Sequence, residues 1–119
     1  GNEATQIVEK LIKPSKNIKL VICGHTGDTE TMSAFRSELN AEGKAVHMMM
    51  FNPQAISGWN GNGGDGWLRI LEFKSDGKTI KARTYSPLFG ASQKTESFAW
   101  SRDGKNEFQF VMDEMPTAK

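Results

Sequence analysis

Three turn signals in series constrain the fold of this chain more than any other feature. The segments NAEGK (40–44), KSDGK (74–78) and SRDGKN (101–106) each separate two short runs rich in apolar residues. Glycine in a short polar segment between apolar runs indicates a hairpin, and Asp-Gly, present at 76–77 and 103–104, is its strongest form. The sequence therefore predicts three β-hairpins, the last two within residues 67–119.

One helix and one strand are predicted before the hairpins. Apolar residues recur at helical spacing in the range 2–13, and Pro14 ends the pattern. The apolar positions are Ile7, Val8, Leu11 and Ile12. The run LVIC at 20–23 is apolar without alternation, which is typical of a strand buried on both faces.

Alternation assigns faces to two of the later strands. In the last strand Phe108, Phe110 and Met112 share one face, opposite Gln109 and Val111. The strand WLRILEF at 67–73 is largely apolar on both faces, so we expect it to be central in its sheet.

Length and composition limit the classes of function. The 119 residues indicate a single domain, with helix and linker at 1–17, strand, Gly-His loop and first hairpin at 18–51, and a glycine-rich loop at 52–66. A net charge of +1 is too small to indicate nucleic-acid binding, and no apolar run reaches the roughly 20 residues of a membrane span. The start GNEATQ shows no signal peptide, although an upstream signal in a longer protein stays open.

His25 follows the buried strand directly, after Gly24. Loops at the carboxyl ends of strands in α/β folds often carry functional sites, so His25 is a candidate metal ligand. The alternative is an ordinary loop histidine bonded to the backbone, and Asp28 and Glu30 are either further site residues or a solvated charged loop.

The loop GWNGNGGDG at 58–66 is the second candidate site. Its permissive backbone can direct several N–H groups at an anion, and an aromatic ring beside it can stack on a substrate. A plain connection is an equal alternative. The candidate substrate residues are Trp59, Asn60, Asn62 and Asp65.

The sequence predicts structural roles for the remaining histidine, the methionine run and the cysteine. His47 alternates with Met49 and Phe51, which favours a packed histidine within a strand. The three consecutive methionines at 48–50 indicate core packing. Cys23 is expected to be a buried, inert residue.

Taken together, the segments IKLVICGH, GKAVHMMMFNPQ and GWLRILEFKSDGKTIKARTYSP resemble the C-terminal portion of bacterial calcineurin-like metallophosphoesterases, over about Ile18 to Met112. The resemblance implies an α/β fold, a fragment of a four-layer α/β/β/α sandwich. It further implies hydrolysis of phosphate mono- or diesters by a metal-activated water, with divalent Mn, Zn or Fe as cofactor and His25 as a ligand.

The departures from the family pattern limit what this chain does alone. Gly27 stands where the Gly-His-x-His motif places its second histidine, and the family's upstream aspartate and histidine motifs are absent. Two metals need about six to eight protein ligands. We therefore expect the fragment to bind none and to be inactive alone, with the phosphoester acted on by the complete protein.

Two other readings stay open. One is a non-enzymatic β-rich module that binds a carbohydrate or protein through Trp59, Trp67 and the glycine loop. The other is a degenerate phosphoesterase that has lost turnover, as Gly27 suggests. In each case an exposed sheet edge is open to pairing with a second copy of the chain.

Overall fold

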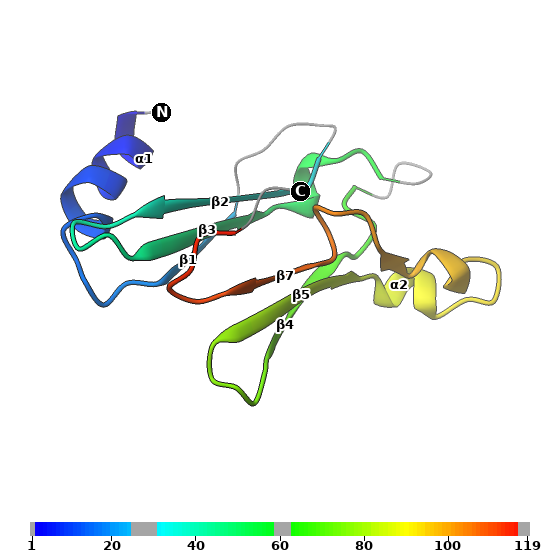
Figure 1. The fold of residues 1–119 in the computed structure, drawn as a ribbon. Helices are drawn as coiled ribbons and strands as arrows, with labels where there is room; N and C mark the ends of the chain where they lie inside the picture. Colours follow the sequence, from blue (N-terminus) through cyan, green and yellow to red (C-terminus); the bar gives the residue numbers. More distant parts are fainter. Residues whose placement is uncertain (1, 25–30, 59–62, 117–119) are drawn as a thin grey trace.

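The computed structural model describes residues 2–24, 31–58 and 63–116, which form a small, strand-rich α/β domain with two sheets (Figure 1). Sheet A has the order β1 (Leu20–Cys23), β3 (Ala45–Phe51), β2 (Ser33–Leu39). β1 runs parallel to β3, and β2 runs antiparallel to it. Sheet B is antiparallel and is built around β5 (Thr79–Tyr85).

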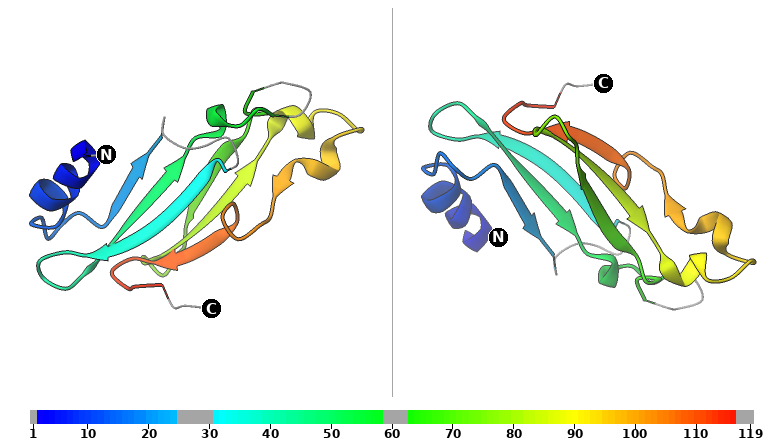
Figure 2. Two further views of the ribbon diagram at one scale, coloured as in Figure 1. Left: turned by 90° about the horizontal axis from the view of Figure 1, so that it is seen from above. Right: turned by 90° about the horizontal axis from the view of Figure 1, so that it is seen from below.

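The N-terminal helix covers part of the outer face of sheet A (Figures 1 and 2). It consists of α1 (Asn2–Ile7) and a π-helical turn, η1 (Val8–Ile12). Val8 and Ile12 are buried against Val46, whereas Ile7 and Leu11 are more than half exposed. The predicted helix is thus confirmed, but only half of its apolar positions face the sheet.

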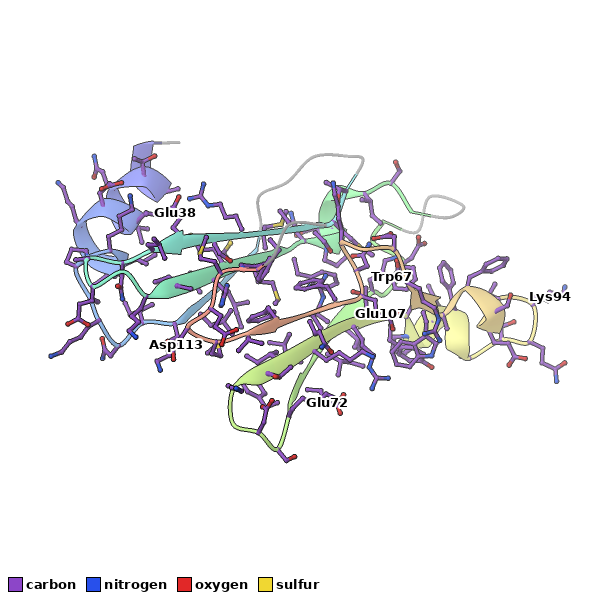
Figure 3. All side chains as sticks on the ribbon, in the orientation of Figure 1. Glu38, Trp67, Glu72, Lys94, Glu107 and Asp113 are labelled. Atoms are coloured by element: carbon purple, nitrogen blue, oxygen red, sulfur yellow. The ribbon has the colours of Figure 1, made fainter. Side chains whose placement is uncertain are left out.

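The two sheets pack face to face around a second cluster. Its buried members are Met49, Ile80, Ala82 and Phe110, and Leu20, Phe35, Leu71, Phe108 and Met112 pack against them. Side chains from both sheets fill the space between β3 and β5 in Figure 3. The prediction that Phe108, Phe110 and Met112 share one face is therefore confirmed, and that face points between the sheets.

Two hairpins form as predicted, and the third does not. β2 pairs with β3, and β4 (Leu68–Phe73) pairs with β5. β6 (Trp100–Ser101) and β7 (Phe108–Val111) pair with β5 one after the other along the same edge and not with each other. The prediction that 67–73 is central was also wrong: among the described residues β4 pairs only with β5, and β5 is the central strand.

The two Asp-Gly turns differ in backbone conformation. Gly77 has φ +76°. The carboxylate of the preceding Asp76 accepts hydrogen bonds from the Thr79 hydroxyl and from the Lys78 and Thr79 amides, and these bonds lower the pKa of Asp76 to about 2. Gly104 lies outside the left-handed region, and the Asn106 and Glu107 amides bond the Asp103 carbonyl in a helical turn. The turn therefore lacks the left-handed glycine of a two-residue hairpin, and the strands on either side of it pair with β5 instead of with each other.

This difference predicts unequal effects of the same substitution. Gly77→Ala should lower the free energy of unfolding by about 1 kcal/mol, because alanine is strained at positive φ. Gly104→Ala should change it by less than about 0.5 kcal/mol, since an added Cβ meets nothing within 4 Å. Urea denaturation of both variants measures this, and equal losses would contradict the assignment of the two turns.

The strand Leu20–Cys23 forms where predicted, but the expectation that it is buried on both faces was wrong. β1 lies at the edge of sheet A, with Ile22 60% exposed and Cys23 also exposed. Among the described residues the run therefore lies at an edge despite its apolar composition. Within the part of the chain that the structure describes, no helix has the length and apolar character needed to cross a membrane.

Short helical segments connect some of the strands. α2 (Pro87–Gly90) begins at Ser86, whose Oγ accepts a hydrogen bond from the Phe89 amide and so caps the helix. The single turns η2 (Pro53–Ala55) and η4 (Glu96–Phe98) follow β3 and precede β6.

Candidate active-site cleft

The segment that carries His25 lies outside the described residues, but both of its flanks are described. Gly24 follows the carboxyl end of β1, and Thr31 precedes β2, so the flanks stand on either side of the end of β3. A Cβ added to Gly24 would lie 3.2 Å from the carbonyl oxygen of Phe51, the last residue of β3. The close approach of these main chains favours glycine at this position.

A polar cleft of about 510 Å³ opens at this same end of the molecule. Thr31 forms part of its wall, together with the turn 103–106 that joins β6 to β7. Its lining residues are Thr31, Met32, Ile56, Ser101, Asp103, Gly104, Lys105 and Asn106. The chain therefore passes from the end of β1 to the wall of a cleft through the segment that contains His25.

Buried polar side chains form the base beneath the cleft. Ser33, at the start of β2, donates from Oγ to Asn106 Oδ1. Thr84 Oγ1 donates to the Asn106 carbonyl at 2.8 Å, and Asn106 Nδ2 lies 3.0 and 3.1 Å from the carboxylate oxygens of Asp103. Because Ser33, Thr84 and Asn106 are 2%, 0% and 7% exposed, this polar base ties the 103–107 turn to both sheets.

Arg69 lies at the centre of the polar base. Its Nη2 donates to Ser33 Oγ at 2.7 Å, and its Nε donates to Thr84 Oγ1 at 3.1 Å. Its guanidinium carbon stands 4.6 Å from the ring centroid of Phe51 and 5.4 Å from that of Phe108. The guanidinium thus joins sheet B to the end of sheet A.

The charge of Arg69 has no ion-pair partner among the described residues, and its Nη1 is buried there without a hydrogen bond. Burial lowers the pKa of Arg69 to about 10, and the nearby Asp103 carboxylate offsets part of this shift. The guanidinium thus places a positive charge beneath the cleft, and the Asp103 carboxylate in the cleft wall balances part of it.

Lys105 adds a second cation at the cleft. It lines both this cleft and an adjoining one of about 500 Å³, and Thr31 also lines both. Its backbone amide is held by the Asp103 carboxylate at 2.9 Å, which fixes the turn from which its side chain projects.

The glycine loop is described only from residue 63 onward, so its candidates Trp59, Asn60 and Asn62 lie outside the described residues. The amides of Gly63, Gly64 and Trp67 donate to backbone carbonyls at 2.9 to 3.2 Å. Asp65 is 6% exposed, and its carbonyl accepts a hydrogen bond from Ser86 Oγ at 2.6 Å. In this half of the loop the three amides serve a packed connection, while the substrate role of Asp65 stays a prediction.

His47 is packed, as predicted. It is 0% exposed, its Nε2 donates to the Val111 carbonyl at 2.9 Å, and Ser37 Oγ lies 2.6 Å from its Nδ1. Met49 is buried in the inter-sheet cluster and Met48 packs beneath the helix, which confirms core filling for these methionines. The prediction of a buried Cys23 was wrong, because β1 is an edge strand.

Sequence reasoning did not identify Arg69, Lys105 or the polar base. The available signal was the alternation in the sequence, which places the charged Arg69 on the same strand face as Trp67, Leu71 and Phe73.

The residues that the structure describes contain no group of three or more His, Cys, Asp or Glu side chains placed to hold a metal ion. The predicted ligand His25 stays untested.

Comparisons with known proteins add one relative. No protein-family model matches the chain, and no solved structure matches it significantly. The chain is 28% identical over 121 residues to the uncharacterized protein YvnB of Bacillus subtilis (strain 168). The match takes in 96% of this chain and 8% of that protein, so the chain is similar to a small part of a much longer bacterial protein.

Proposed function

We propose that this chain is the C-terminal part of a bacterial calcineurin-like metallophosphoesterase and contributes to an active site that other parts of a longer polypeptide complete. One observation carries the proposal: the segment containing His25 runs from the carboxyl end of β1 to the wall of a polar cleft. In α/β folds, sites lie at this end of the strands.

The layers of the domain support the proposal. A helix, a mixed sheet and an antiparallel sheet are stacked in that order, which corresponds to three layers of an α/β/β/α sandwich. Among the described residues no helix covers the outer face of sheet B (Figures 1 and 2). The fourth layer would come from the longer polypeptide, and the length of the Bacillus relative is consistent with such an arrangement.

The metal site would be shared in the same way. His25 offers an imidazole nitrogen, whereas Gly27 offers no side chain, so most ligands to Mn, Zn or Fe would come from elsewhere in the complete protein. A bound divalent metal lowers the pKa of its water and supplies hydroxide near neutral pH. Lys105, with Arg69 beneath it, would attract the phosphoester anion to the cleft.

The proposal predicts metal-dependent hydrolysis. The complete protein should hydrolyse p-nitrophenyl phosphate or bis-p-nitrophenyl phosphate with Mn, Zn or Fe present, and EDTA should abolish the activity. The 119 residues alone serve as the control and should be inactive. Metal binding without hydrolysis would indicate the degenerate form, and absence of metal binding by the complete protein would overturn the proposal.

The described residues do not favour the binding-module alternative. The ring of Trp67 lies edge-on against Phe89, with 5.5 Å between centroids and 88° between planes. Figure 3 labels Trp67 on the side of the molecule where the short helix α2 lies. Trp67 is half-buried, so its indole contributes to packing within the domain.

A further inference from the structure

Within the part of the chain that the structure describes, one edge of β1 is open. Among the described residues β1 pairs only with β3, and the His47 amide donates to the Lys19 carbonyl at 2.9 Å. Because peptide groups alternate along a strand, those of Leu20 and Ile22 point away from β3. Leu20 packs between the sheets, yet Ile22, two positions further on, is 60% exposed. Such a row of peptide groups is a template on which another strand can pair.

The two edges of sheet A are built differently. β2 carries Arg36 and Glu38, which stand 3.7 Å apart, and charges of this kind discourage pairing with another strand. β1 has the sequence LVIC, with no charge and no proline. The edge of β2 is thus protected, while that of β1 has the composition of a strand that is paired on both sides.

An apolar groove of about 470 Å³ adjoins this edge on the outer face of sheet A. One wall is the N-terminal helix, where Ile7 is 53% exposed. The floor includes Val21 and Cys23 of β1 and Met48 and Met50 of β3. The groove lies beside the helix and extends to β1, so the groove and the open edge form one continuous surface. A second helix packed on this face of the sheet would lie in the groove.

We propose that a strand and an amphipathic helix from the rest of a longer polypeptide cover this surface, the strand pairing with β1 and the helix lying in the groove. The Bacillus relative supplies the argument for this occupant, since only 8% of its length corresponds to this chain. Arg36, 62% exposed at the rim of the groove, suits an acidic residue on that helix. The inference rests on the part of the proposed function that places this chain in a longer polypeptide, and not on its chemistry.

A second copy of the chain fits the surface less well. Pairing β1 with its copy would join strands of only four residues, and both grooves would stay open because each helix already covers its own sheet. Stable dimers bury about 1,200 Å² or more in total, which so short a pairing does not approach.

Cys23 reports whether the surface is covered. We expect N-ethylmaleimide to label Cys23 at least about 10-fold more slowly in the folded complete protein than in the 119 residues alone, with EDTA present and labelling located by peptide mass spectrometry. In denaturant the two rates should be equal. Equal rates in the folded proteins, or a coding sequence with no residues beyond these 119, would overturn the proposal.

Two lysine substitutions provide a matched test. Ile22→Lys should leave the Tm of the 119 residues nearly unchanged but lower that of the complete protein by about 5 °C or more. Leu39→Lys, at 50% exposure on the protected edge, should change neither. An Ile22→Lys variant that is as stable as the wild type in the complete protein would count against the inference.

Two further outcomes separate this inference from others. If light scattering shows that the 119 residues dimerise with Cys23 protected, while Cys23 reacts freely in the complete protein, the occupant is a second copy and the proposal fails. Hydrolysis measured on the same sample is an independent result. Protection of Cys23 without hydrolysis supports this inference and counts against the phosphoesterase proposal. Hydrolysis without protection of Cys23 overturns this inference alone.

Discussion

Arg69→Ala is expected to lower the free energy of unfolding by about 3 kcal/mol. The guanidinium donates to Ser33 and Thr84, whose hydroxyls are almost completely buried. Without it, these oxygens lose partners in a place where water does not reach them easily, and the contact with the Phe51 ring is lost as well. Urea denaturation measures the loss, and Arg36→Ala, at an exposed arginine, should cost less than about 0.5 kcal/mol.

Arg69→Met separates packing from hydrogen bonding. Methionine retains an apolar stem against Phe51 and removes a buried charge without an ion-pair partner, so it should cost clearly less than alanine. A loss equal to that of alanine would show that the hydrogen bonds dominate. If neither variant destabilises the domain, the polar base does not hold the sheets together as described.

His25→Ala is expected to reduce kcat/KM for p-nitrophenyl phosphate at least about 100-fold in the complete protein, equivalent to about 2.7 kcal/mol. The expected cause is loss of a nitrogen ligand, so bound metal should fall in parallel with the rate. Metal analysis and steady-state kinetics on the same preparation measure both quantities.

Thr29→Ala is the matched control, because it changes the same segment without removing a candidate ligand. It should retain activity within about threefold. If His25→Ala behaves like Thr29→Ala in both rate and metal content, His25 is not a ligand. The phosphoesterase proposal would then depend entirely on residues outside this chain.

Elements that depend on neighbouring residues in the sequence, such as the first two hairpins, could be predicted. Gly43 and Gly77 both adopt φ +76°, and each lies in the turn of a hairpin that forms as expected. The alternation around His47 correctly indicated a packed side chain. The same Asp-Gly pair failed at 103–104 because Asn106 is drawn inward by Ser33 and Thr84, which are distant in sequence.

Features set by topology were not predictable from the chain. The composition of LVIC indicated burial, but only the strand order shows that β1 lies at an edge. Arg69 binds uncharged residues 15 and 36 positions away, and no charge pattern marks such partners. The positive charge beneath the cleft was missed for this reason.

Hydrogen bonds join the two sheets at both ends of the space between them. At one end His47 of β3 donates to the Val111 carbonyl of β7, and Lys19 contacts Asp113 at 2.9 Å; Figure 3 places Asp113 at this end. At the other end Arg69 of β4 donates to Ser33 of β2. Apolar contact alone would allow the sheets to slide or rotate against each other, whereas two links at opposite ends resist both motions. The distance between the cleft walls, Thr31 on one side and the turn 103–106 on the other, thus depends on bonds at both ends of the domain.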